Sequence, residues 1–173
     1  AWHLGPAFEN AGHHVNEVYS RQLTHARQLV SMLYDARPAM DLNFADSPSA
    51  LFVISVPDAA LEDVCARLVL PEGAAVVHTS GSMSLEMLTH YLAMYSDVPL
   101  RSGVFYPLQS FARGRPLLPF DDVPLCLEAA DATLEDELVA LGQSMSDTVY
   151  LVSSNERLTL HVAAVFANNF TNH

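Results

Sequence analysis

The last segment of the chain places polar residues inside an apolar stretch that is typical of a helix. His161 and Asn168 are seven residues apart, so they share one helix face, and Asn169 follows directly. The residues from Val162 to Phe166 are apolar and are expected to be largely buried, and buried polar groups need hydrogen-bond partners. One interpretation is a helix that lines a site, with His161 as proton donor or substrate anchor. The other is helix-to-helix packing with internal hydrogen bonds, which the spacing alone slightly favours.

Small and hydroxyl residues follow two predicted strands. Ser55, Val56 and Pro57 end one strand, and the run from His78 to Gly81, which contains Thr79 and Ser80, ends the next. In an open parallel sheet, ligands bind at the carboxyl ends of the strands, where such residues leave room for a ribose or a nicotinamide ring. Ordinary strand-to-helix turns with capping hydroxyls would have the same composition, and His78 also fits a hydrogen-bonded histidine near the core.

The end of an earlier strand carries Ser20 and Arg21, with Thr24 and His25 nearby and no acidic residue. An NAD enzyme usually has Asp or Glu at this position, which binds the ribose 2′-hydroxyl. A hydroxyl and a guanidinium instead suit a 2′-phosphate, because Arg binds phosphate in a bidentate way. The alternative is an exposed loop arginine, which is the simpler interpretation of Arg21 without other context.

Alternating strands and helices with short loops organise these residues. In the central stretch, apolar or small residues from Ala50 to Val56 predict a strand buried on both faces, and Pro57 begins a helix. The alternation predicts an α/β protein with a parallel sheet. The predicted strands are 15–19, 50–56, 74–79, 103–106, 124–128 and 148–152; the predicted helices are 1–11, 24–36, 57–70, 84–95, 133–145 and one from a Ser153/Glu156 capping box to the end.

Two turn residues and two weaker segments complete this prediction. Gly12 is a plausible end for the first helix, and Thr24 is a possible cap of the second. A short strand and a turn are expected between Pro38 and Ser49, and a loop from Arg113 to Asp122.

A helix followed by a strand is the order found in a dinucleotide-binding unit after its first strand and glycine turn. In the G-x-G-x-x-G/A motif of that turn, only the last position could correspond to a residue of this chain, namely Ala1. The chain does not begin with Met and ends inside a predicted helix, so we expect a fragment of a longer protein. Ala1 by itself is no evidence for the motif, because the glycines are not in the given sequence.

The composition limits the possible functions. The chain of 173 residues has a net charge of −12, which argues against nucleic acid and anionic membrane surfaces as partners. It has eight Arg and no Lys, which excludes a lysine base or Schiff base within this stretch. No spacing of His and Cys suggests a metal site, and no P-loop or G-x-S-x-G motif is present. Cys65 and Cys126 lie in apolar contexts and are expected to be buried free thiols, which agrees with a cytoplasmic protein.

Five stretches, in this order, resemble a known family: VYSRQLTHA, FVISVPDAAL, VVHTSGSMS, GVFYPLQSF and RLTLHVAAVFANNFTNH. The chain resembles Rossmann-like proteins provisionally assigned as NADP oxidoreductases. These pair a coenzyme domain like that of pyrroline-5-carboxylate reductase with a helical C-terminal domain of unknown function. The resemblance covers nearly the whole chain and implies a Rossmann-type, doubly wound, mostly parallel sheet over 1–152. It also implies that 153–173 begin a helical domain that forms a homodimer.

The resemblance implies roles for individual residues. Ser20 and Arg21 would select NADP, and Ala1 would close the glycine turn. Thr24 is a further candidate for binding the coenzyme. Ser55, Val56 and Pro57 would lie beneath the nicotinamide ribose, with Thr79, Ser80 and Gly81 beside the nicotinamide. Tyr106, Pro107, Gln109, His161 and Asn169 would line the substrate side. The related hydroxyacid dehydrogenases have a catalytic Lys on the corresponding helix; here that region offers His161, so a hydroxyacid dehydrogenase reaction is not implied.

These observations predict an NADP(H)-dependent oxidoreductase acting on a small carbonyl or imine, with His161 and Tyr106 as candidate catalytic residues. A rival interpretation is a non-catalytic NADP-binding or redox-sensing module. A third is another nucleotide ligand on the same fold, such as a deazaflavin or S-adenosylmethionine.

Overall fold

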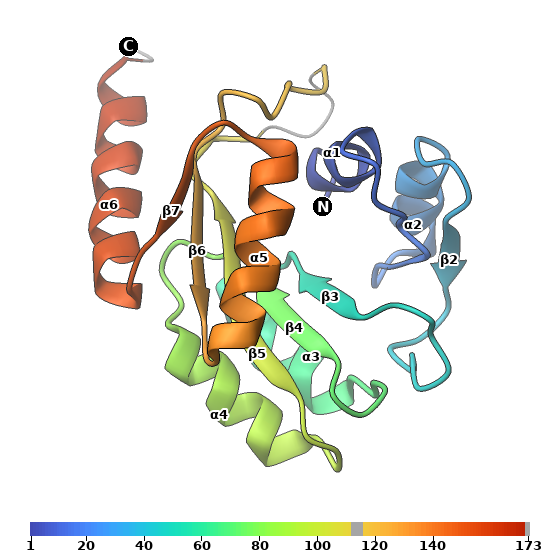
Figure 1. Cartoon of the computed structure of the whole chain (residues 1–173). Coiled ribbons are helices and arrows are strands. Elements are labelled where there is room, and N and C mark those ends of the chain that lie inside the picture. The colour runs from blue at the N-terminus through green and yellow to red at the C-terminus, as the bar shows by residue number, and fades with distance from the viewer. Residues whose placement is uncertain (112–115, 172–173) are drawn as a thin grey trace.

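The computed structural model describes residues 1–111 and 116–171, with side chains described up to Ala167. Helices and strands alternate along most of the chain (Figure 1). In chain order, the elements are α1 (Leu4–Asn10), β1 (Glu17–Tyr19), α2 (Leu23–Val30), β2 (Arg37–Ala39), β3 (Leu51–Ile54), the 3-10 helix η1 (Asp58–Ala60), α3 (Leu61–Arg67), β4 (Ala75–His78), α4 (Leu85–Tyr95), β5 (Arg101–Pro107), β6 (Leu125–Ala129), α5 (Ala132–Met145), β7 (Val149–Leu151) and α6 (Ser154–Thr171).

The main sheet has five strands in the order β3-β4-β5-β6-β7. The pairs β3–β4, β4–β5 and β6–β7 are parallel, and each pair is connected through a helix. Only β5 and β6 pair antiparallel among the described residues, because no helix crosses over between them. The predicted mostly parallel α/β sheet is therefore confirmed.

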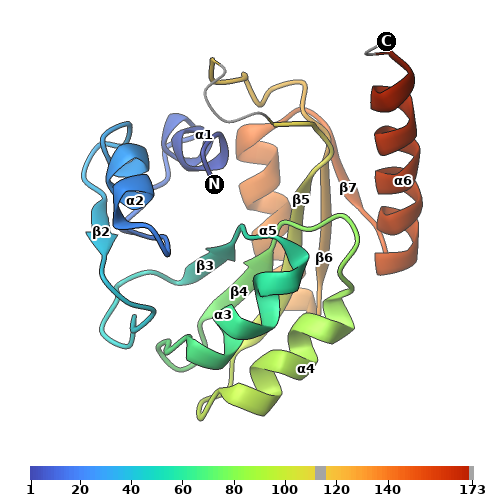
Figure 2. The same cartoon turned by 180° about the vertical axis from the view of Figure 1, so that it is seen from behind.

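Helices cover both faces of this sheet, as the doubly wound fold requires (Figures 1 and 2). Side chains of alternate residues in β4 point to opposite faces of the sheet. Val77 packs with α1 and α5, and Val76 packs with α3 and α4. All four residues of β4 are buried, as expected for a strand covered on both sides.

The edge strand β3 differs from the prediction of a strand buried on both faces. Ile54 is buried, but Leu51, Phe52 and Val53 are only partly buried. The reason is that β3 pairs with β4 alone, whereas β1 and β2 form a separate two-stranded parallel ladder. The side of β3 away from β4 therefore has no strand partner among the described residues.

The first helix ends as the sequence predicts. Gly12 adopts φ +87°, His13 N donates to Phe8 O at 3.0 Å, and Gly12 N donates to Glu9 O at 3.0 Å. These two bonds form a Schellman motif, in which glycine is favoured because an L side chain is strained at positive φ.

Two helices are shorter than predicted. Helix α2 ends at Val30 instead of Ala36, because Glu9 from α1 accepts a hydrogen bond from Tyr34 N at 2.9 Å and holds the following residues in turns. Thr24 lies inside α2 and is not its cap. Helix α3 ends at Arg67 instead of Leu70, because Val69 N bonds Leu42 O at 3.0 Å in an extended bridge.

The start of α6 is as predicted. Glu156 accepts hydrogen bonds from the Ser153 N and Oγ atoms, both at 2.7 Å, and Glu156 N donates to Ser153 Oγ at 3.4 Å. This capping box satisfies amide groups that would otherwise lack a partner at the helix start.

Candidate functional site

Most of the residues predicted to bind a coenzyme border one cavity. It has a volume of about 740 Å³ and is lined by β1, β3 and the segments that follow them. Six predicted residues are among its lining: Ala1, Ser20, Arg21, Ser55, Val56 and Pro57. The Ala1 nitrogen donates to Ser55 Oγ at 2.7 Å, so the start of the chain meets the end of β3.

Thr24 does not belong to this group. It is exposed on α2 and does not line the cavity, whereas the next residue, His25, does. Thr79 and Ser80 lie at the end of the neighbouring strand β4 and are also not part of the lining.

Part of this cavity is a space between strand edges. Ala75 N donates to Ala50 O at 2.9 Å, and Thr79 N donates to Ile54 O at 3.2 Å. Successive residues of a strand point their backbone groups to opposite sides. The N–H and C=O groups of Leu51 and Val53 are therefore directed away from β4, toward the cavity that both residues line.

The loops after β3 and β4 are joined to each other. Ser82 Oγ donates a short hydrogen bond to the Asp58 carboxylate. Ser80 Oγ accepts from Ser82 N at 3.1 Å and from Met83 N at 3.0 Å. The Ser80 hydroxyl thus caps its own turn, and the Ser82–Asp58 hydrogen bond links the two loops at the carboxyl edge of the sheet.

Tyr106 and His161 meet across the carboxyl end of β5. Tyr106 Oη and His161 Nδ1 are 2.9 Å apart, and the two rings contact each other edge-on with centroids 5.8 Å apart. Burial of the phenol raises the pKa of Tyr106, so its hydroxyl stays protonated and can donate to a neutral His161. Gly81 lies directly against the His161 ring. Three predicted site residues are therefore brought together.

A buried ion pair fixes the helix that carries His161. Arg157 is 1% exposed and lies one turn before His161, with its guanidinium in a short contact with Glu128 of β6. The same guanidinium donates to Met83 O at 2.5 Å, and Ser154 N donates to Glu128 Oε1 at 3.1 Å. Helix α6 is thereby joined to β6 and to the β4–α4 loop.

Sequence reasoning did not single out Arg157 and Glu128. One signal was present, because Arg157 is four residues before His161 and is one of only eight basic residues apart from histidine. Its partner could not be found in this way, since Glu128 is 29 residues away in the chain.

His78 ends β4 and is 1% exposed. Its Nδ1 accepts a hydrogen bond from Ser80 N at 3.1 Å. Burial, and secondarily the charge of Arg157, lower the pKa of His78 from 6.5 to about 4. This imidazole is therefore neutral at physiological pH and acts as a structural group of the core.

Two of the remaining predicted substrate residues, Pro107 and Gln109, are not part of this cluster. Pro107 is buried in β5 and pairs with Leu125. Gln109 is exposed, and its Oε1 accepts from Ser110 N at 2.9 Å. Asn169 lies in α6, but its side chain is outside the described residues.

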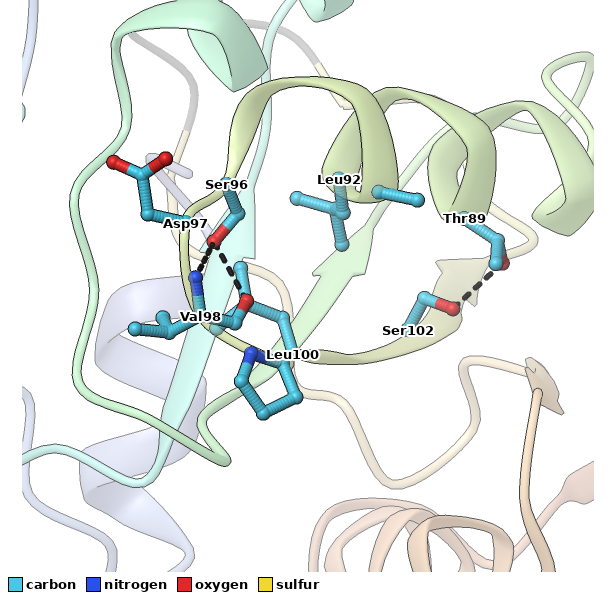
Figure 3. Close-up of a pocket in the computed structure, with 9 residues that line it drawn as sticks. Thr89, Leu92, Ser96, Asp97, Val98, Leu100 and Ser102 are labelled. Atoms are coloured by element: carbon cyan, nitrogen blue, oxygen red, sulfur yellow. Dashed lines mark hydrogen bonds between the residues drawn. The ribbon is translucent and has the colours of Figure 1, made fainter.

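A second hollow of about 350 Å³ lies between the end of α4 and the start of β5 (Figure 3). Its hydroxyl groups bond to local partners: Thr89 and Ser102 are 2.7 Å apart, and Ser96 Oγ donates to Val98 O at 2.8 Å. It adjoins the amino end of β5, so it is at the opposite edge from Tyr106.

Within residues 1–111 and 116–167, no group of three or more His, Cys, Asp or Glu could hold a metal ion. No helix in the described part of the chain is long and apolar enough to cross a membrane.

A mostly parallel sheet with helices on both faces and hydroxyl-rich loops at its carboxyl edge defines a Rossmann-like α/β protein. Residues 2–101 match the model of the Rossmann-like domain, and the chain belongs to that family. Residues 123–173 match a domain of unknown function, DUF2520. The suspected family resemblance is therefore confirmed.

Several solved structures are similar to this chain. A Bacteroides fragilis protein provisionally described as an NADP oxidoreductase is 33% identical over 100% of this chain and 64% of its own, with a TM-score of 0.86. A Thermotoga maritima protein is 23% identical over 96% of this chain and 60% of its own, with a TM-score of 0.69. A reductive aminase from Aspergillus terreus, solved with NADPH and ethyl-5-oxohexanoate, is 14% identical over 96% of this chain and 56% of its own, with a TM-score of 0.66.

The last two likenesses show the fold alone. The chain spans 56% to 64% of the length of these three proteins. No curated protein matches it.

Proposed function

We propose that this chain is the coenzyme domain of an NADP(H)-dependent oxidoreductase that reduces or oxidises a small carbonyl or imine. The fold supports a nucleotide-binding protein, and the 33% identical relative is itself provisionally described as an NADP oxidoreductase. The observation that carries the reaction is the Tyr106–His161 hydrogen bond at the carboxyl edge of the sheet.

The donor set after β1 fits a phosphorylated ribose. Arg21 is exposed at the rim of the cavity and forms no ion pair with any acid in the described part of the chain. Glu17, the acid nearest in β1, already accepts from Ser47 Oγ at 2.5 Å. Ser20 and Arg21 would therefore bind a 2′-phosphate.

The chain's own residues would supply the proton that accompanies hydride transfer. When bound, NADPH supplies the hydride that adds to the C=O or C=N carbon. In the protonated imidazole of His161, Nδ1–H donates to Tyr106 Oη, and Nε2–H remains for the substrate oxygen or nitrogen, which receives the electron pair of the broken π bond. After this transfer the neutral ring keeps its proton on Nδ1 and still donates to Tyr106 Oη, so Tyr106 holds the ring in both states.

We also propose that a further parallel strand pairs between β1 and β3. Two facts support it: neither strand has a partner on the cavity side within the described residues, and Leu51 and Val53 direct backbone groups into the space. An unpaired apolar strand edge is an aggregation hazard, so natural proteins cover it. A strand here would place its carboxyl end beside Ala1 and Ser55.

Amide hydrogen exchange in the full-length natural protein tests this strand. We expect the Leu51 and Val53 amides to be protected as strongly as those of Phe52 and Ile54, which face β4. Rapid exchange of Leu51 and Val53 alone would show that the space stays open.

Coenzyme selection by Arg21 is tested with Arg21→Ala. Loss of a charge-assisted hydrogen bond should raise the Kd for NADPH about 10-fold or more and change the Kd for NADH little. Arg27→Ala is the matched control, because Arg27 is exposed on α2 and does not line the cavity. Equal effects of Arg21→Ala on both coenzymes would remove Arg21 as the selector.

Turnover is tested by NADPH oxidation with ketones, keto acids and imines. His161→Ala should reduce turnover by about 100-fold or more and leave the Kd for NADPH unchanged, since general acid catalysis contributes that much. Tight NADPH binding without turnover on any substrate would favour the non-catalytic sensing module instead.

We further propose that α6 packs against a second copy of the protein. Apolar side chains on α6 are exposed, which supports an interface: Leu158, Leu160, Val162, Val165 and Phe166. Sedimentation of the natural protein measures this directly, and a monomer at micromolar concentration would contradict it.

A further inference from the structure

Gly81 lies in the loop between β4 and α4, where it is buried. Its φ is not positive, because the glycines with positive φ among the described residues are Gly12 and Gly73. An alanine could therefore adopt its backbone conformation. What this position requires is space.

The space is taken by His161. A Cβ atom on Gly81 would lie 2.4 Å from His161 Nδ1, 2.5 Å from its Cγ and 2.8 Å from its Cβ. These distances are far below van der Waals contact. Gly142, another glycine in a tight place, would bring its Cβ no closer than 3.2 Å to Leu127 and Val149.

Rotation of the His161 side chain would not relieve this clash. The Cβ atom of His161 is fixed by the α6 backbone, so either the helix or the loop would have to move. The helix is held one turn earlier by Arg157, which bonds Glu128 and Met83 O. The loop is held by Ser80 Oγ, which accepts from the amides of Ser82 and Met83.

We infer that Gly81 is a positioning residue whose missing side chain admits the His161 ring to Tyr106. This role differs from a direct contact between Gly81 and a substrate. The inference rests on the proposed function only where the Tyr106–His161 pair is given a role in proton transfer. The geometry of the pair can be measured without any turnover.

The test is nitrogen NMR of the His161 ring in the full-length protein. In the wild type, the hydrogen bond between Tyr106 Oη and His161 Nδ1 favours one tautomer of a neutral ring, and the two ring nitrogens of a single tautomer give well-separated shifts. Tyr106→Phe removes this bond and defines the reference spectrum without it. We expect Gly81→Ala to shift the His161 signals toward that reference.

Gly142→Ala is the matched control, because it also adds a methyl group at a buried glycine, but one whose nearest neighbours are Leu127 and Val149 and not this ring. We expect its His161 signals to match the wild type. Wild-type His161 signals in Gly81→Ala would overturn the inference, and so would an equal shift in Gly142→Ala.

If the Gly81→Ala variant folds too poorly for NMR, a second measurement, of thermal stability, tests the inference. In a His161→Gly background the added methyl group meets no ring and no Cβ, so we expect Gly81→Ala to lower the Tm by less than half as much as it does with His161 present. An undiminished loss of Tm would contradict the inference. Absence of NADPH turnover would defeat the proposed reaction but leave both of these results unchanged.

Discussion

The two walls of the candidate site are built in different ways. On the coenzyme side, β1 and β3 both lack a neighbour on the cavity side within the described residues, and Arg21 and Val56 are exposed. On the opposite side, α6 is joined to β6 and to the β4–α4 loop by one buried guanidinium. The first wall exposes groups that can bind a ligand, whereas the second fixes one ring, that of His161.

This difference indicates which wall tolerates substitution. Exposed groups at a strand end add little to folding, so they are free to serve binding. A buried charge, by contrast, contributes or costs several kcal/mol depending on its partner. Substitutions in the α6 wall should therefore affect stability first, and those in the β1–β3 wall should affect ligand affinity first.

The largest effect is expected for Glu128→Ala. It leaves the Arg157 guanidinium, 1% exposed, without its carboxylate, and the free energy of unfolding should fall by about 3–5 kcal/mol. Denaturation with urea measures this loss. Glu137→Ala is the matched control, because Glu137 also pairs with an arginine, Arg101, at 2.9 Å but is 50% exposed.

The control pair should contribute less than about 1 kcal/mol, as solvent-exposed ion pairs do. Equal losses in the two variants would mean that Arg157 is solvated in solution and that α6 is not fixed as described.

The Glu128–Arg157 pair also shows where sequence reasoning ends. The order of strands and helices follows from local apolar patterns, and the Ser153–Glu156 capping box is a local motif, so both could be predicted. The pairing of Glu128 with Arg157 depends on two elements meeting in space, and no local pattern specifies it. The early end of α2 has the same cause, since Glu9 from another helix captures Tyr34 N.

In the candidate site, too, local patterns could be predicted from the sequence, whereas contacts between distant elements could not. The strand-end groups Ser20, Arg21 and Ser55 were found because parallel strands bring their carboxyl ends to one edge. Tyr106 and His161 were named separately, from the family resemblance and from helix spacing. Their hydrogen bond, and the space that Gly81 leaves for it, required the structure.

The second largest effect is a pH dependence of stability that comes from His78. Its folded-state pKa is about 4 and its ordinary value is 6.5, so between these values the unfolded state binds a proton that the folded state does not. Stability should therefore fall as the pH drops from about 6.5 to about 4. The loss should approach about 3 kcal/mol, since one pKa unit corresponds to about 1.4 kcal/mol.

His78→Asn removes the titrating ring and should flatten the stability profile over this pH range. Urea denaturation at a series of pH values measures the two profiles. A wild-type profile that is already flat between pH 6.5 and 4 would show that His78 is accessible to protons in the folded state, and that this part of the core is less closed than the structure indicates.

A smaller effect is expected at the start of the α6 wall. Ser153→Ala removes one side of the capping box and should lower the free energy of unfolding by about 1 kcal/mol. The Glu156 carboxylate would lose the Ser153 hydroxyl, the first cause of its lowered pKa. A loss as large as that of Glu128→Ala would mean that the cap, and not the buried ion pair, holds α6.

The smallest effect on stability is expected at the β1–β3 wall, for Arg21→Ala. The Arg21 side chain is exposed and has no ion-pair partner among the described residues, so the free energy of unfolding without ligand should change by less than about 0.5 kcal/mol. The difference should appear when NADPH is present, because a ligand stabilises a protein according to its affinity, and the weakened variant gains less. Thermal unfolding of both proteins, with and without NADPH, measures this directly. A large loss without ligand would place Arg21 among the groups that hold the fold together, and the contrast between the two walls would then fail.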